Sequence, residues 1–175
     1  MKKFHALAIA IALASASAAA SAAEGSGVYV RGEVGNSTLH VDGDSGTDTA
    51  MSGWVGYNFN NTFAIEGHYG SLGKDSEQGA TIEMTAVGLG LRLKHDFGNS
   101  YYIAGRAGME RVENEISGFG ESFTDTANKV YVGVGGGFNF SNNFAVTAYW
   151  DTRQVPFFGE DERVDTLTIG AEYRF

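Results

Sequence analysis

Apolar residues alternate with polar or small residues along most of the chain after residue 27. In one segment, for example, Val130, Val132 and Val134 occupy every second position. Alternation with a period of two is typical of a β-strand with one apolar face, whereas an amphipathic helix repeats every three to four residues. Gly, Asn, Asp and Ser separate eight such stretches, which are 28–34, 51–59, 63–69, 86–94, 102–110, 130–140, 144–153 and 166–175. The pattern predicts an all-β chain.

The first 23 residues follow a different pattern. Lys2 and Lys3 precede an apolar run, which passes into alternating Ser and Ala. This order is typical of a secretory signal peptide, with small-residue cleavage sites after Ala22 or Ala23, of which we choose Ala23. The alternative, a membrane anchor, is disfavoured because the apolar run has about half the length needed to span a bilayer. We therefore expect residues 1–23 to be a signal peptide and residues 24–175 to form one domain.

The face of each strand opposite the apolar one carries charges of both signs. The residues concerned are Arg31, Glu33, Glu66, Arg92, Arg106, Glu110, Asp151, Arg153, Glu172 and Arg174. Its other positions are rich in Gly and Ala, as expected for the crowded interior of an eight-stranded barrel. Opposite charges can pair across such a lumen. We therefore predict that these ten residues form a lumen charge network and that the apolar face meets lipid.

Aromatic residues of the apolar face gather near the short connections, where a membrane-interface girdle would lie. In hydrocarbon every backbone polar group must be paired, and a closed sheet achieves this because it has no edge. The sequence thus predicts an eight-stranded antiparallel up-and-down transmembrane β-barrel. The alternative is a soluble barrel with the apolar face inside, which would expose the charged face and overfill the lumen.

The connections between strands alternate in length. Short turns are expected near 60–61, 96–99 and 141–143, and longer polar loops over 36–49, 71–81, 112–128 and 153–165. In outer-membrane barrels the short turns face the periplasm and the long loops face outside. Leu39, Val41, Ile82 and Met84 lie out of phase with the apolar residues of their strands. Either the lipid-facing band ends there, or a β-bulge changes the phase.

Composition removes several classes of function. The chain has no Cys, so it has neither disulfides nor thiolate metal sites. Its net charge of −9 repels the phosphates of nucleic acid. His40 and His95 are expected near opposite ends, and we predict no metal or other cofactor. The acidic residues of the longer connections form either a solvated surface or ligands for divalent cations that bridge to lipopolysaccharide phosphates.

Segments 28–35 and 56–70 resemble the first strand and first periplasmic hairpin of small eight-stranded outer-membrane barrels, namely the OmpA transmembrane domain and the OmpX/Ail group. The end of the chain resembles the terminal strand of this family, which the barrel-assembly machinery recognises. The residues that carry this assembly signal are Leu167, Ile169, Tyr173 and Phe175. The resemblance also places Glu66 and Arg92 among interior charges that pair, whereas the acidic position of strand seven holds Tyr149 here, with Asp151 two residues on.

The resemblance implies a monomer in the outer membrane of a Gram-negative bacterium, in contact with outer-membrane lipid and lipopolysaccharide. It implies envelope stability as the function, together with display of acidic surface loops in adhesion to an extracellular ligand. Two alternatives remain. One is a narrow ion pore gated by Glu66, Arg92 and Arg106. The other is a lipid-A-modifying hydrolase using Glu66, His68 and Ser71, although the alternation turns Ser71 away from the lumen. We expect no enzymatic activity.

Overall fold

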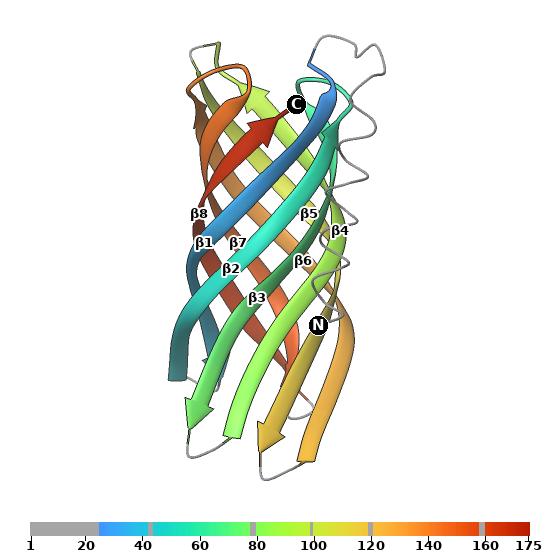
Figure 1. Ribbon diagram of the computed structural model, residues 1–175, viewed down its shortest axis with the longest axis vertical. Coiled ribbons are helices and arrows are strands. Elements are labelled where there is room, and N and C mark those ends of the chain that lie inside the picture. Colours follow the sequence, from blue (N-terminus) through green and yellow to red (C-terminus); the bar gives the residue numbers. More distant parts are fainter. Residues whose placement is uncertain (1–24, 42–43, 78–79, 99, 119–120, 158–159) are drawn as a thin grey trace.

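The computed structural model describes residues 25–41, 44–77, 80–98, 100–118, 121–157 and 160–175, which form a closed barrel of antiparallel strands (Figure 1). The strands are β1 (Gly27–Val41), β2 (Asp44–Asn58), β3 (Phe63–Glu77), β4 (Ala80–Asp96), β5 (Tyr101–Gly118), β6 (Glu121–Asn139), β7 (Phe144–Phe157) and β8 (Glu160–Arg174). Each strand pairs with the next, and β8 closes the barrel on β1. The predicted eight-stranded up-and-down barrel is confirmed. The predicted signal peptide lies outside the described residues.

The two ends of the barrel differ. One end, which we call the turn end, holds the tight connections around 59–62, 97–100 and 140–143, and the C-terminus lies there beside the start of β1 (Figure 1). The opposite end, which we call the hairpin end, is where β1 meets β2, β3 meets β4, β5 meets β6 and β7 meets β8. Within the described ranges no helix has the length and apolar character needed to cross a membrane.

The segments predicted from the sequence as longer polar loops are largely β-strand. The prediction of loop structure in these segments is therefore wrong. The pairing of β1 with β2 continues to Val41 and Asp44, and that of β5 with β6 continues to Gly118 and Glu121. The strands contain 14 to 19 residues, whereas a tilted membrane strand needs about 9–11. Polar side chains on both faces look like a loop in the sequence, but cross-strand hydrogen bonds still hold the backbone extended beyond the apolar band.

The side chains alternate as predicted between the exterior and the lumen. Leu89 on the outer face is 68% exposed, whereas Arg31 on the inner face is 2% exposed. A soluble barrel would show the opposite distribution, because burying apolar side chains is what stabilises proteins in water. The apolar exterior therefore requires a hydrocarbon environment, and the soluble alternative is excluded.

The out-of-phase apolar residues that the structure describes mark the end of the outer apolar band. Leu39 on β1 and Met84 on β4 point inward and pack against an apolar cluster formed by Leu72, Ala86, Val112 and Val164. The pairing of β1 with β2 and of β4 with β5 has no shift, so the outer band simply ends on these strands. A register shift lies instead between Ser71 and Gly73 of β3. The side chains of Val41 and Ile82 lie outside the described part.

Candidate functional site in the barrel lumen

The ten charged residues predicted for the lumen all lie at inward positions of their strands. Nine are buried, and the side chain of Arg174, near the turn end, is 17% exposed. The set contains five arginines and five carboxylates, so its formal charges cancel. Burying a charge is costly unless a partner compensates it, and each of the five arginines has at least one carboxylate within ion-pair distance.

Nearest the turn end, Glu66 and Glu172 bind three arginines. Arg31 Nη1 lies 3.0 Å from Glu66 Oε1 and 3.2 Å from Glu172 Oε2, while Arg92 Nη1 lies 2.5 Å from Glu172 Oε2. Arg174 Nε donates to Glu172 Oε1 at 2.8 Å. The hydroxyl of Tyr29 donates to Glu66 Oε1. These contacts join strands from opposite sides of the barrel, because Arg92 is on β4 and Glu172 on β8.

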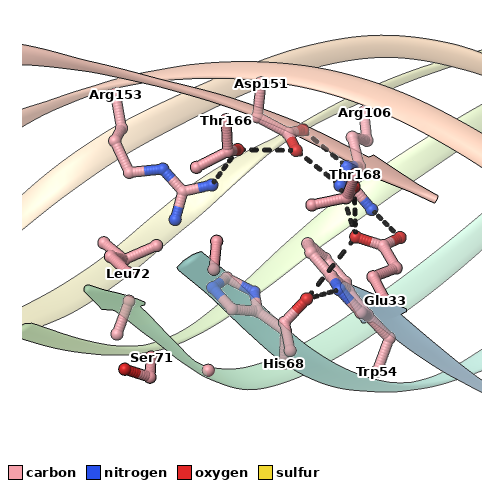
Figure 2. A pocket seen from close by; sticks show the side chains of 14 residues that line it. Glu33, Trp54, His68, Ser71, Leu72, Arg106, Asp151, Arg153, Thr166 and Thr168 are labelled. Carbon is pink, nitrogen blue, oxygen red and sulfur yellow. Dashed lines mark hydrogen bonds and ion pairs between the residues drawn. The ribbon is translucent and has the colours of Figure 1, made fainter. Parts of the chain in front are cut away.

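In the middle of the lumen, Arg106 binds two carboxylates. Its Nη1 lies 2.8 Å from Glu33 Oε1, and its Nη2 lies 2.5 Å from Asp151 Oδ2 (Figure 2). The guanidinium carbon lies 4.0 Å from the ring centroid of Trp54 and also 4.0 Å from that of Tyr149. A guanidinium stacked between aromatic faces gains cation–π attraction and loses rotational freedom. Arg106 is thus fixed both by charge and by shape.

Toward the hairpin end, the network finishes at His68, Glu110 and Arg153. His68 Nε2 lies 3.1 Å from Glu110 Oε2, and Arg153 Nη1 lies 3.4 Å from the same oxygen. The His68 ring stacks on Trp54 with 4.3 Å between centroids. Beyond these polar groups, on the hairpin side of the network, lies the apolar cluster of Leu72, Ala86, Val112 and Val164.

The free space in this part of the lumen is small. A cavity beside His68, Arg153 and Thr166 has a volume of about 20 Å³, which is room for about one water molecule. A wider opening of about 560 Å³ lies at the turn end, where asparagines of the turns surround Lys94 and Arg174. The charged part of the lumen is therefore a packed core rather than a water-filled channel.

Sequence reasoning missed the aromatic partners of the network. Tyr29, Trp54 and Tyr149 are buried beside the arginines, and Arg92 lies 4.2 Å above the Tyr29 ring. The alternation of the sequence places all three on the charged face, and this was the signal that could have found them. It could not show that they would stack on guanidinium groups, because those contacts cross between strands that are distant in the sequence.

The residues considered for a hydrolase do not come together. His68 contacts Glu110 through Nε2, and Glu66 binds Arg31. Ser71 pairs with the outward residue Met51, and its hydroxyl points away from His68 in Figure 2. A Ser–His–carboxylate site needs the hydroxyl within hydrogen-bond reach of the imidazole. Glu66, His68 and Ser71 therefore do not form such a site.

The histidines and carboxylates that the structure describes do not form a metal site either. Among the described residues, no group of three or more His, Asp or Glu side chains could hold a metal ion. His40 lies 3.4 Å from Asp165 near the hairpin end, and His95 packs against Phe97 at the turn end.

The residues of the predicted assembly signal lie along β8 and directly after it. Leu167, Ile169 and Tyr173 are exposed on the outer face of β8, and Phe175, which follows the strand, is exposed as well. β8 is the strand that closes the barrel, through its pairing with β1 from Tyr29 and Arg174 to His40 and Arg163.

A closed barrel with an apolar exterior and a charge-compensated lumen defines a small β-barrel membrane protein. The chain belongs to the outer membrane protein β-barrel domain family, whose profile matches residues 6–175. No curated protein matches the chain significantly.

Solved structures of the same fold include three outer-membrane proteins at low sequence identity. Neisserial surface protein A has 14% identity and a TM-score of 0.75, covering 85% of this chain and 97% of its own. Ail of Yersinia pestis has 22% identity and a TM-score of 0.64, covering 87% and 100%. The N-terminal barrel of OprF from Pseudomonas aeruginosa has 14% identity and a TM-score of 0.59, covering 85% and 99%. These similarities show the fold.

Proposed function

We propose that this protein is a non-conducting, non-enzymatic barrel of the outer membrane, which stabilises the envelope and presents acidic hairpins to the exterior. The observation that carries the proposal is the lumen, where five arginines and five carboxylates are paired. The cavity beside Arg106, Asp151 and Arg153 has a volume of only about 20 Å³. A lumen filled in this way ties the strands together but leaves no room for a substrate. The hairpin end is then the part of the molecule free to interact.

The filled lumen argues against the ion pore considered from the sequence. A pore needs a continuous path for hydrated ions, whereas Glu66, Arg92 and Arg106 are each buried and held by partners. Planar-bilayer recording of the purified barrel tests this point. We expect no unitary current steps from the wild type or from Arg92→Ala. Current steps in the wild type that change in Arg92→Ala would support the salt-bridge gate and refute the proposal.

We further propose that the hairpins bind cationic surfaces. Asp and Glu greatly outnumber Lys and Arg in segments 36–49, 71–81, 112–128 and 153–165. The solved structure of Ail in complex with sucrose octasulfate, a heparin analogue, contains a polyanionic ligand bound to a barrel of this fold. The acidic hairpins here would repel such a ligand, since like charges at a surface suppress association. The negative charge of the hairpins therefore favours a cationic partner.

Binding of proteoliposomes to coated surfaces tests this preference for cationic over anionic partners. We expect the wild type to adhere to polylysine and not to heparin, with adhesion falling as salt is raised. A variant carrying Glu121→Gln, Asp125→Asn, Glu160→Gln and Glu162→Gln should lose much of this adhesion. The matched control is Asp96→Asn, which removes an acidic charge at the turn end. Equal adhesion of the wild type and the four-site variant would refute the proposal.

We propose that the protein reaches the outer membrane by export of a precursor. Residues 1–23 would be removed, and the barrel-assembly machinery would recognise the exposed side chains of β8. Outer-membrane fractions test this step. We expect a protein that begins at Glu24, is monomeric, and migrates faster on a gel before boiling than after it. Recovery of the protein from the soluble fraction without detergent would refute the proposed location.

A further inference from the structure

The turn end of the barrel holds a polar cavity that the charge network leaves unfilled. Its volume of about 560 Å³ lies within the range of roughly 300–1,000 Å³ that is usual for ligand pockets. The charged residues of its wall are Lys94, Asp96 and Arg174. The wall also contains six asparagines, namely Asn58, Asn60, Asn61, Asn139, Asn142 and Asn143. We call this cavity the turn-end pocket, and its size and polarity suit a ligand.

Some of the asparagines hold the wall of the pocket in place. Asn60 Oδ1 accepts hydrogen bonds from the backbone N–H groups of Thr62 and Phe63, both at 2.8 Å. Asn143 Nδ2 donates to the carbonyl oxygen of Arg174 at 2.8 Å. Side-chain bonds of this kind fix the conformation of a turn. The two turns that border the pocket are therefore preformed.

Asn61 and Asn142 have no such structural task. Within the described ranges neither side chain takes part in a hydrogen bond. Asn61 is nevertheless held in position, because its Oδ1 fills the space that a Cβ on Gly25 would occupy. Gly25 has a φ of +83°, a conformation that favours glycine. A carboxamide offers one acceptor and two donors, so these two asparagines can pair with the N–H and C=O groups of a peptide.

Two cations lie in the wall of the same pocket. Arg174 donates to Glu172 Oε1 through Nε, and among the described residues neither of its Nη groups has a carboxylate partner. Lys94 Nζ lies 3.1 Å from Asp96 Oδ2. The charge of Arg174 acts on Lys94, so two like charges lie near each other, an arrangement that a bound anion stabilises. Their side chains are 12% and 17% exposed, so they can be reached from the pocket.

The wall suits a single carboxylate on a chain that carries amide groups. A guanidinium binds a carboxylate through two parallel charge-assisted hydrogen bonds, and both Nη groups of Arg174 are available for them. Asp96 lies in the same wall. Its negative charge disfavours a ligand with many anionic groups, such as a polyphosphate, since like charges repel. The carboxamides supply both donors and acceptors for the rest of the chain.

We propose that the turn-end pocket binds an acidic peptide segment, with its carboxylate on Arg174 and Lys94 and its peptide groups on Asn61 and Asn142. The turn end of an outer-membrane barrel faces the periplasm, so the partner is a periplasmic chain. The inference goes beyond the proposed function, which concerns partners outside the cell. It rests on that function only for the orientation of the barrel in the membrane.

Peptide titrations followed by NMR test the proposal on the purified barrel in detergent micelles. The probes are a capped Ala-Glu-Ala tripeptide, the matched Ala-Gln-Ala tripeptide and sodium acetate. We expect the side-chain amide signals of Asn61 and Asn142 to shift with the glutamate peptide and to saturate. The glutamine peptide should bind about ten-fold more weakly, because it loses the charge-assisted hydrogen bonds. Acetate should also bind more weakly, because it has no peptide groups.

Two variants locate the contacts. Arg174→Gln should weaken binding of the glutamate peptide about ten-fold, and Asn142→Ala about five-fold. Because Arg174 also compensates Glu172, its variant is first checked for heat-modifiable mobility, whereas Asn142 lies in a turn outside the charge network. The matched control is Arg111→Gln, which removes an exposed cation of β5 far along the chain from the pocket wall and should leave the affinity unchanged.

Several results would overturn the proposal. One is the absence of saturable shifts in the wild type, and another is equal affinity for the glutamate and glutamine peptides. Acetate that binds as tightly as the glutamate peptide would show a simple anion site, and tighter binding of a neutral oligosaccharide would point to a glycan instead. Unchanged affinity in both Arg174→Gln and Asn142→Ala would also count against it. None of these results alters the conductance or adhesion expected of the proposed function.

Discussion

Arg106 and Asp151 are joined by two hydrogen bonds across the lumen, from Nε to Oδ1 at 2.6 Å and from Nη2 to Oδ2 at 2.5 Å. Arg106 is on β5 and Asp151 on β7, two strands that do not pair with each other. Between them Gly133 of β6 is the register partner of both residues. The ion pair thus spans the intervening strand, passing over a position that has no side chain.

Removing one member of this pair should be costly. Arg106→Met leaves the buried Asp151 carboxylate without its strongest partner, and we expect a loss of about 3–5 kcal/mol in the free energy of unfolding. Asp151→Asn should cost less, because Glu33 still compensates Arg106. The double variant should lose less than the sum of the two single losses. The midpoint of denaturant unfolding, followed in one detergent as the loss of the folded gel band, measures the stability of all three variants. Losses that simply add would show that the pair is not coupled.

Gly133→Ala should weaken the same pair without touching either charge. A Cβ at this position would collide with Asp151 Oδ1 and lie 3.1 Å from the Trp150 carbonyl oxygen. The carboxylate must then move away from Arg106, and we expect a loss of about 1–3 kcal/mol, typical of an overfilled interior. The control is Gly53→Ala, where a Cβ would have no neighbour within 4 Å. Equal stability of the two variants would contradict the packed lumen.

Leu72→Ala tests the apolar cluster at the hairpin side of the network. Leu72 is buried beside Ala86 and Val112, and its truncation should cost about 2–5 kcal/mol through lost contacts and a new cavity. Leu72→Met, which keeps the volume, should cost less than about 1.5 kcal/mol. Denaturant midpoints again provide the measurement. A negligible effect of Leu72→Ala would show that the cluster does not stabilise the barrel.

Asp165 Oδ2 lies 2.8 Å from Arg163 Nη2, and this ion pair, which we call the Asp165 clasp, should open in acid. Partial burial raises the pKa of Asp165, but hydrogen bonds from Arg163 and Thr152 and the nearby positive charge outweigh it and hold the pKa below its ordinary value. The clasp is therefore complete above the ordinary pKa of about 3.9 and is lost as the pH falls through the lowered value. Because Arg163 lies 5.9 Å over the exposed Trp150 ring, tryptophan fluorescence should change with a midpoint below pH 3.9.

Two variants check the origin of this transition. Asp165→Asn cannot be ionised, so the fluorescence change should vanish. Arg163→Ala removes the main stabilising partner, so the midpoint should move to higher pH. A transition that persists unchanged in Asp165→Asn would show that another group titrates, for instance in the buried network around Trp54.

The sequence by itself determined the number of strands, the face each strand turns to lipid and the residues that occupy the lumen. It could do so because a strand has a period of two, and because hydrocarbon and a narrow lumen select opposite kinds of side chain. It did not predict how far the strands continue. Pairing of the backbone beyond the membrane depends on hydrogen bonds and not on polarity, so segment 112–128 looked like a loop although most of it is strand in β5 and β6.

Only the tertiary structure decided which charges meet. Alternation placed Arg31, Glu33 and Arg106 on one face but could not pair them, because the partners are set by the stagger of the closed barrel. The same closure stacks Arg106 of β5 between Trp54 of β2 and Tyr149 of β7, and it brings Arg92 of β4 to Glu172 of β8. Each of these relations joins strands distant in the chain, and a local pattern holds no information about such distances.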